Sequence, residues 1–468
     1  MQFNQFVTDY DENLTGDTYV DPLGVQVIWS VFGSQVFRNR VNSISNDVRN
    51  YTLNLLNHRI IRDLVDDDSV VVGRWLEESI GKKSSLSFRQ ACLIYLENLF
   101  TYSLISADNN QGVNTAGVLG GAKGRREYEE LNSKPELILS HREDAHLLVR
   151  QLGLGVSGRY KTPFMEIGFF DASYHYRLPE SEGLWAKADV LFQHSKNLES
   201  VYNKARSHLA DLITMSVKKS SVPPRQCFAK DIPIELKRAY QSAFATAGRV
   251  GTETRDFWLA STGLNQGAAG ALLQVLDAEA AHPSQEHVSE AELFQRAGTR
   301  CNLDGAIDEA RKIQHILTLE PLLAELDLLF TLALHRRHQS IDEVASLWTN
   351  MGRNNETLLH AAQRILELPS LFVVVQGTAK FRLNRLLEAA SLSTVEQQLR
   401  ELLSYHAGVM RSRGQLPWVI VKGGAQIKVD ARTQSLPEKD KRPLGTWVNR
   451  YYLPQFNNLV NGFRGEVA

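Results

Sequence analysis

The sequence contains little cysteine. Cys92, Cys227 and Cys301 are the three cysteines of a 468-residue chain, and they lie far from one another. No pair has the CxxC or cysteine-histidine spacing of a metal site, and the number is odd. These features argue against a disulfide-stabilised scaffold and against a zinc finger. We expect no cofactor.

Long apolar runs are also missing. A helix that crosses a bilayer needs about 20 apolar residues, whereas the longest runs here are short, such as Leu371–Val375. Residues 1–17 are acidic and lack the basic and then apolar segments of a secretion signal. We therefore expect a cytoplasmic protein that does not contact a membrane.

The patterns that are present are mostly helical. Apolar residues recur every three or four positions over residues 37–55, 86–105 and 182–215, and again over 319–333 and 395–409. Residues 418–422 and 425–429 flank Gly423 and Gly424, which predicts a β-hairpin with a two-residue turn. The expected fold is mainly α: an irregular multi-helix bundle or array with a Gly-rich loop insertion and a small C-terminal β-hairpin.

Composition divides the chain into four segments, because 468 residues are too many for one core. The predicted domains are an N-terminal helical domain (1–107), a Gly-rich and aromatic-rich mixed segment (108–180), a helical domain with long heptad-patterned helices (181–410), and a basic C-terminal hairpin followed by an aromatic helix (411–468).

The Gly-rich stretch is the first candidate for function. Nine of the 31 glycines fall between residues 112 and 168. Glycine permits tight turns and close approach of the backbone to another group, and nearby positive charge favours an anion. The candidate anion-binding residues here are Lys123, Arg125, Arg126, Arg159 and Lys161. A flexible surface loop with ordinary solvated charges is the alternative.

Two phosphate-binding patterns fail in this stretch. Gly153, Gly155 and Gly158 spell GxGxxG, but a dinucleotide site needs a strand before it and a helix after it. The preceding residues have a helical pattern, and Pro163 follows. The phosphate-loop pattern fails because Ala122 stands before Lys123, where glycine is required. We therefore expect no dinucleotide and infer no ATPase.

The carboxyl-terminal segment is the second candidate. Residues 411–468 contain ten basic and four acidic residues, while the whole chain has a net charge of −1. Aromatic residues lie among the cations, as in proteins that stack bases and hold phosphates. The candidate anion-binding residues are Arg411, Arg413, Lys422, Lys439, Lys441 and Arg442. A basic tail that packs against the chain's own acidic surface would give the same pattern.

One set of residues suggests an enzyme. Glu166, Asp171 and His175 lie in an aromatic-rich stretch, and two carboxylates with a histidine can form a metal or acid-base site. Their spacing favours no single helical face, so packing is the simpler interpretation.

These observations lead to three hypotheses. The favoured one is a non-enzymatic helical subunit of a multiprotein complex that binds nucleic acid, DNA rather than RNA, or another anionic partner. The second is a metal-dependent nuclease or phosphohydrolase that uses Glu166, Asp171 and His175. The third is a purely structural protein-protein scaffold.

Overall fold

Two compact units make up the structure, which is a computed structural model. It describes residues 21–466 except 44, 108–111, 133, 219–225 and 283–287. Helices account for 65% of the chain, so the predicted mainly helical fold is confirmed. Of the described residues, unit 1 contains 39–263 and 454–466, and unit 2 contains 21–38 and 264–453. The division into four segments by composition stays a prediction.

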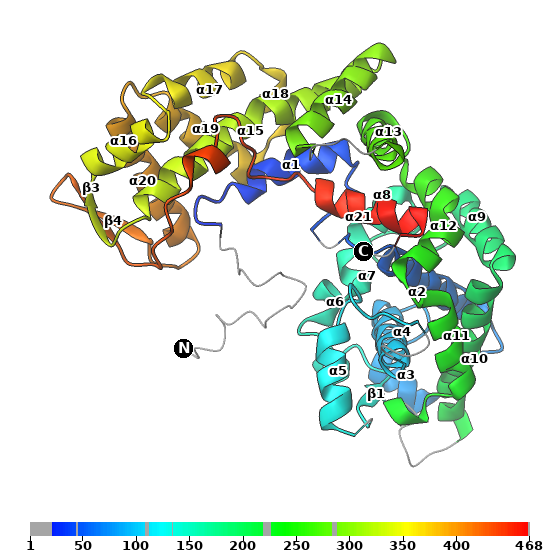
Figure 1. Ribbon diagram of the computed structural model, residues 1–468. Helices are drawn as coiled ribbons and strands as arrows, with labels where there is room; N and C mark the ends of the chain where they lie inside the picture. Colours follow the sequence, from blue (N-terminus) through cyan, green and yellow to red (C-terminus); the bar gives the residue numbers. More distant parts are fainter. Residues whose placement is uncertain are drawn as a thin grey trace. The chain divides into compact units, whose positions relative to one another are not determined.

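Unit 1 is helical apart from a two-stranded antiparallel sheet of β1 (Glu136–Ile138) and β2 (Gln226–Phe228), and Figure 1 shows its elements. Its helices are α2 (Val48–Asp66), α3 (Arg74–Ile80), α4 (Leu86–Ile105), α5 (Gly121–Glu130), α6 (Gln151–Leu154), α7 (Val156–Arg159), α8 (Lys161–Ile167), α9 (Glu182–His194), α10 (Lys196–Lys218), α11 (Ile234–Phe244), α12 (Ala247–Thr262) and α21 (Leu453–Arg464), whose first residue belongs to unit 2.

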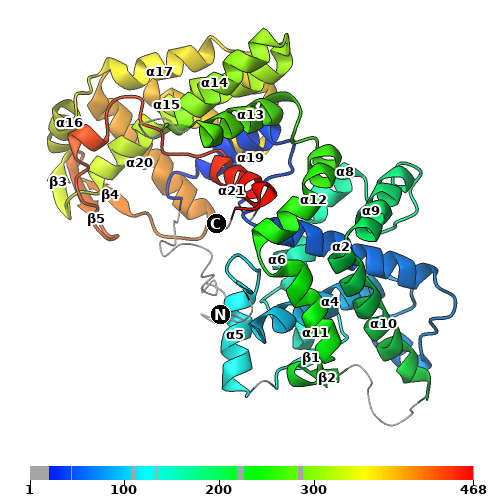
Figure 2. The same ribbon diagram turned by 45° about the vertical axis from the view of Figure 1, so that its right-hand side comes forward.

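Helix α4 is the core of unit 1. Seventeen of its twenty residues are buried, because α2, α5 and α11 all pack against it. The Ser85 hydroxyl caps its first turn by accepting a hydrogen bond from the Phe88 N–H at 3.2 Å. Figure 2 shows α4 among these neighbours. The helix predicted over residues 86–105 is therefore confirmed at both ends.

Glycines allow α21 to pack closely on α12. A Cβ atom added at Gly251 would lie 2.0 Å from the Gly462 carbonyl oxygen, and one at Gly248 would lie 2.6 Å from the Gly465 oxygen. Side chains at these positions would force the two backbones apart. The end of the chain is thus part of unit 1.

Unit 2 is built around the 27-residue helix α15 (Ile307–Ala333), which packs against α1, α14, α16, α17 and α20. The other helices of this unit are α1 (Gln26–Val36), α13 (Gly267–Ala281), α14 (Glu290–Leu303), α16 (Ile341–Asn350), α17 (Glu356–Leu366), α18 (Ser370–Val374), α19 (Gly377–Ala390) and α20 (Val395–Ser412). The leucine-rich patterns predicted over 319–333 and 395–409 lie within α15 and α20.

The predicted hairpin is confirmed near the end of unit 2. Strands β4 (Val419–Lys422) and β5 (Gln426–Val429) pair antiparallel across Gly423 and Gly424, whose φ angles are 57° and 78°. Both glycines therefore have the left-handed conformation that such a turn requires. Strand β3 (His338–Ser340) adds to β5, which gives the order β3-β5-β4 and a third strand that the sequence pattern did not predict.

Two predicted helices are wrong in their extent. Residues 37–43 and 45–47 are not helical, because α1 ends at Val36 and the Asp47 side chain caps α2 by accepting from the Arg49 N–H. The helix predicted over 182–215 breaks at Ser195, whose hydroxyl accepts from the Leu198 N–H at 3.2 Å and so starts α10. In both cases a side chain able to cap a helix interrupts an apolar stripe that continues past it.

The C-terminal aromatic residues differ from the prediction as well. Trp447 and the residues after it form no helix until α21 begins at Leu453. Tyr451 and Tyr452 have φ angles of 49° and 64°, in the left-handed region. This segment is held instead by hydrogen bonds to Glu320, two of them from main-chain N–H groups.

Candidate functional site

Helix α5 carries three of the predicted anion-binding residues. Arg126 is exposed, and the Lys123 ammonium lies 4.0 Å from the Glu127 carboxylate. Arg125 donates a hydrogen bond to the Thr115 hydroxyl and so ties the helix to the loop before it. Arg126 is therefore the most exposed cation of this helix, and the Lys123 side chain is 33% exposed.

The other two predicted cations of the Gly-rich stretch bind main-chain oxygens. The Lys161 ammonium donates to the Ala172 carbonyl at 2.6 Å and lies 4.5 Å from the centre of the Tyr174 ring. The Arg159 guanidinium donates to the Leu154 carbonyl at 2.9 Å. Both side chains thus help to fix the loops around α7 and α8.

The basic carboxyl-terminal segment is partly neutralised within unit 2. Three of its six candidate residues form ion pairs, two of them with carboxylates far away in the sequence: Arg413 with Asp21, Arg442 with Asp327, and Lys441 with Glu438. Arg411, Lys422 and Lys439 are exposed. The alternative of a basic tail that packs on the chain's own acidic residues therefore accounts for part of the charge.

Glu166, Asp171 and His175 do not form one cluster. The Glu166 carboxylate pairs with the Arg40 guanidinium at 2.8 Å, while Asp171 pairs with His175 at 2.7 Å. The hydrogen bonds from His175 and Ser173 lower the pKa of Asp171 against the effect of burial. In the described part of the chain, no three His, Cys, Asp or Glu side chains come together as metal ligands would. Metal-dependent catalysis stays a hypothesis without a preformed site.

The residues around the GxGxxG pattern fold differently from a dinucleotide site. Residues 146–150, predicted to be helical, form neither helix nor strand, and Pro163 lies inside α8 rather than blocking it. Gly153 is in α6 and Gly158 is in α7, both of which are four-residue helices. No strand precedes the pattern between residues 139 and 150, so the context for dinucleotide binding is absent there.

A buried glutamate explains why glycine occurs at Gly155. A Cβ atom added there would lie 2.4 Å from Glu97 Oε2 and 2.7 Å from the Gln151 carbonyl oxygen. Glu97 is on α4, and its carboxylate accepts hydrogen bonds from the Ser157 N–H at 2.7 Å and the Gln151 side-chain amide at 3.0 Å. The glycine therefore allows the start of α7 to reach a carboxylate in the core.

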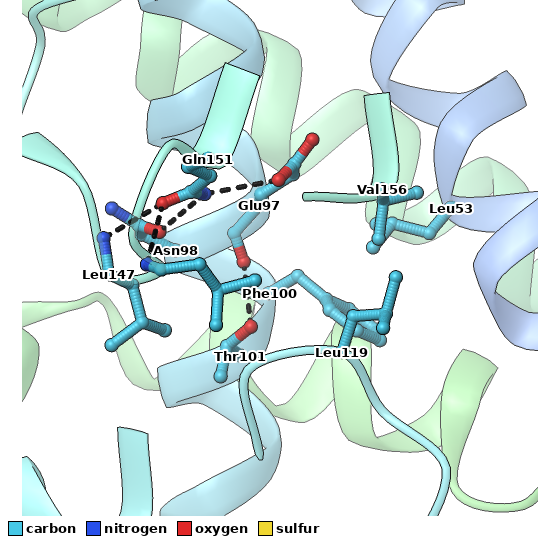
Figure 3. Close-up of a pocket in the computed structure, with 10 residues that line it drawn as sticks. Leu53, Glu97, Asn98, Phe100, Thr101, Leu119, Leu147, Gln151 and Val156 are labelled. Carbon is cyan, nitrogen blue, oxygen red and sulfur yellow. Dashed lines mark hydrogen bonds between the residues drawn. The ribbon is translucent and has the colours of Figure 1, made fainter. Parts of the chain in front are cut away.

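Gln151 links this carboxylate to its neighbours, as Figure 3 shows. Its amide nitrogen also donates to the Asn98 side-chain oxygen at 3.0 Å, and its amide oxygen accepts from the Leu147 N–H at 2.8 Å. The network borders a cavity of about 10 Å³, the size at which one water molecule fits. Burial raises the pKa of Glu97, and its hydrogen bonds act in the opposite direction.

A second buried charge holds the beginning of the Gly-rich stretch. Arg49 on α2 forms an ion pair with Asp47, and the side chains of both residues are at least 95% buried. The same guanidinium donates to the carbonyl oxygens of Asn114 and Ala116. Gly117, with φ of 81°, turns the chain next to Asp47. Positive charge and glycine in this region therefore serve the packing of the stretch onto α2 and α4.

Helix α2 buries further polar groups that lack partners. Asn54 and Asn57 are each 1% exposed, and neither side-chain amide has a hydrogen-bond partner among the described residues. The Oδ1 atom of Asn50, one turn before Asn54, is also unpaired there. The three residues share one helical face because they are spaced by four and three. Unit 1 thus has a polar interior beside its apolar helix α4.

Sequence reasoning missed Glu97, Gln151 and Arg49. One signal was present: Glu97 is the single charged residue between positions 90 and 105, a stretch apolar enough to be buried on all sides. Arg49 gave no comparable signal, because it lies among other polar residues.

Comparison of the chain with known protein families, curated proteins and solved structures finds no match. No helix in the described part of the chain has the length and apolar character needed to cross a membrane. The class defined by the fold is a mainly helical protein of two units, and arguments about its function depend on its own residues.

Proposed function

We propose that the protein is a non-enzymatic helical subunit that binds nucleic acid through the amino end of α5. The charge order of this helix carries the proposal. Lys123, Arg125 and Arg126 lie among its first six residues, and the acidic residues Glu127, Glu129 and Glu130 lie among its last four.

This order is the reverse of the stabilising one. The amino end of a helix carries partial positive charge, so a cation in the first turn, such as Lys123, costs about 0.3 to 1 kcal/mol, and carboxylates in the last turn, such as Glu129 and Glu130, are similarly unfavourable. The Gly120 cap adds no side-chain hydrogen bond to the first turn. An arrangement that costs stability but concentrates positive potential supports the binding of an anion at this end.

Arg150 is an exposed cation of the segment that packs on the amino end of α5. Leu147 packs against Gly120 and Gly124 of the α5 amino end, and Arg150 follows three residues later. Arg150 is exposed and has φ of 52°, an uncommon conformation for a residue other than glycine. We call Lys123, Arg126 and Arg150 the cationic edge of unit 1. Phosphates spaced along a nucleic acid backbone are its natural partners.

The test is a salt titration of binding. Fluorescence anisotropy with labelled duplex DNA, single-stranded DNA and RNA would be measured from about 50 to about 200 mM salt, with and without Mg²⁺. We expect affinity that falls steeply with salt, tighter binding to DNA than to RNA, and intact substrate. The double variant Lys123→Glu, Arg126→Glu should lower the salt slope by about two and the affinity by at least about tenfold.

A matched variant controls for net charge. Lys422→Glu, Lys439→Glu makes the same charge change at two exposed residues of unit 2. The α5 variant places like charges four residues apart, at positions 123 and 127 and at 126 and 130, so circular dichroism and thermal unfolding would verify that it folds as the wild type does. Equal losses in the two variants, or absence of binding at about 50 mM salt, would contradict the proposal.

A further inference from the structure

A separate cleft opens on unit 1 between α2, α9 and the loop that precedes α9. Its volume is about 690 Å³, within the range of sites that hold small molecules or short peptide segments. Arg62, Arg177, Leu178, Pro179, Ala186 and Asp189 are among the residues that line it. None of them belongs to the cationic edge of unit 1.

Arg62, which lines the cleft, shares an acceptor with Arg59, one turn earlier on α2. Arg59 Nε and Arg62 Nη2 both donate to the one Asp189 carboxylate, at 2.8 Å and 3.0 Å. Arg62 Nε donates to Asp63 at 2.7 Å. Within the described residues, no hydrogen bond from Arg62 Nη1 is present, whereas Arg59 Nη1 is buried and a ligand in the cleft cannot reach it. An additional acceptor would therefore be stabilised here.

Aromatic rings hold both guanidinium groups in place. Arg62 lies 4.8 Å from the centre of the Trp185 ring, and Arg59 lies between the Phe192 and Tyr202 rings at 4.6 Å and 3.8 Å. A planar guanidinium fixed in this way loses little conformational entropy when it binds a carboxylate. The cleft is thus preorganised for an acidic group.

The rim of the cleft also favours an acidic group. The Arg177 side chain is 80% exposed and pairs with Asp66 at 3.2 Å. The amino end of α9 also borders the cleft, and Ser181 provides no side-chain cap for it. A helix of thirteen residues adds partial positive charge at this end, which the exposed Glu182 offsets in part.

The remaining lining residues restrict the ligand. Glu182 and Asp189 would repel a polyanion such as nucleic acid, whereas one carboxylate can avoid them. Leu178, Pro179 and Ala186 present apolar surface beside the arginines. The ligand should therefore combine a single acidic group with a neighbouring apolar one.

We propose that this cleft binds an acidic peptide segment of a partner protein. One Asp or Glu carboxylate of the peptide bonds to Arg62 and Arg177, and an adjacent apolar side chain packs on Leu178, Pro179 and Ala186. Charge-assisted hydrogen bonds from the guanidinium groups orient the peptide carboxylate in the cleft. The site is independent of nucleic acid binding by α5.

A phage-displayed library of short random peptides, panned on the full chain, tests the proposal. We expect enrichment of peptides with an acidic residue next to an apolar one. A synthetic peptide from this set should bind to Arg177→Glu at least about tenfold more weakly than to the wild type. A peptide in which Asn or Gln replaces the acidic residue should bind to the wild type more weakly by a similar factor. Ala186→Tyr, which fills the cleft, should abolish binding, whereas Lys187→Tyr on the neighbouring exposed position should leave it unchanged.

Four results would overturn the proposal: no enriched peptide, enrichment without acidic residues, equal binding to Ala186→Tyr, or displacement of the peptide by inorganic phosphate as effectively as by a second acidic peptide. Arg177 and Ala186 are both exposed, so their variants should fold, which circular dichroism would verify. Because the α5 variants leave the cleft intact, failure here is distinguishable from failure of nucleic acid binding.

Discussion

Each unit is built around a buried helix that carries a buried glutamate. In unit 1, Glu97 on α4 accepts hydrogen bonds from Gln151 and Ser157. In unit 2, Glu320 on α15 accepts from the Val448 and Asn449 N–H groups, and also from the Asn449 side chain and the Tyr451 hydroxyl. In both units, one carboxylate fixes an irregular segment distant in the sequence.

The surroundings of the two glutamates differ. Helix α15 is buried mainly through leucines, such as Leu319, Leu322 and Leu326. In unit 1 the neighbour of α4 is α2, whose buried residues include Asn54 and Asn57 without hydrogen-bond partners in the described structure. Unpaired polar groups in a core cost stability and need a reason other than packing. In the described part of unit 2, unpaired buried atoms such as His315 Nδ1 and Gln339 Oε1 lie on different elements, whereas in unit 1 three asparagines with unpaired atoms share one face of α2.

The largest expected effect is that of Glu320→Ala. Removal of the carboxylate leaves four donors without an acceptor, and the free energy of unfolding of unit 2 should fall by about 3 to 5 kcal/mol. Urea unfolding followed by circular dichroism would measure it. The exposed Glu367→Ala is the control. A loss below about 1 kcal/mol would mean that this segment contributes little to unit 2.

Some of these features could be predicted from the sequence, because they depend on local patterns. The apolar residues on all sides of α4 predicted where this helix begins and ends, and the Gly423-Gly424 pair predicted the hairpin turn. Strand β3 was missed because it pairs with β5, about 90 residues away, and is only three residues long. Local patterns contain no information on such pairing.

The candidate site was harder to predict for the same reason. Gln151 is 54 residues from Glu97, and Asn449 is 129 residues from Glu320. The Gly-rich stretch suggested an anion-binding surface, since glycine permits the approach of a ligand and of the chain's own core equally well. Only the fold distinguishes these two uses.

The second prediction concerns pH. Burial raises the pKa of Glu320 from its ordinary value of 4.5 to about 7. Between these values the folded state keeps a proton that the unfolded state releases, so stability should decrease as pH rises from 4.5 to 7. The decrease should be about 3 kcal/mol relative to Glu320→Gln, which has no titrating group there.

Unfolding free energies of the wild type and Glu320→Gln, measured over this pH range, give the difference directly. Other titrating groups cancel in the subtraction. If the difference in unfolding free energy between the wild type and Glu320→Gln stays constant with pH, the four hydrogen bonds hold the Glu320 carboxylate ionised over the whole range. Burial then has no net effect on its pKa.

A smaller effect is expected at Gly155 in unit 1. Its φ of −72° suits alanine, so Gly155→Ala should act through the contacts of the added Cβ, which would lie 2.4 Å from Glu97 Oε2 and 2.7 Å from the Gln151 carbonyl oxygen. We expect a loss of about 1 to 3 kcal/mol. Gly153→Ala is a matched control in α6, since its Cβ meets nothing within 4 Å and should be neutral or slightly stabilising. Equal effects of the two variants would show that neither Glu97 nor the Gln151 carbonyl restricts this turn.

The smallest effect, and the one that tests the comparison most directly, is expected for Asn57→Leu. An unpaired buried amide gains nothing from its surroundings, so its replacement by an apolar side chain of similar size should change stability by less than about 1 kcal/mol. Gln398 in unit 2 is equally buried, but its amide donates to the carbonyl oxygens of Asn355, Ala390 and Leu392. Gln398→Leu should therefore cost about 1 to 3 kcal/mol. If Asn57→Leu costs as much as Gln398→Leu, the amides of α2 have partners in solution, and the polar interior of unit 1 is a hydrated part of its stability rather than a cost imposed by function.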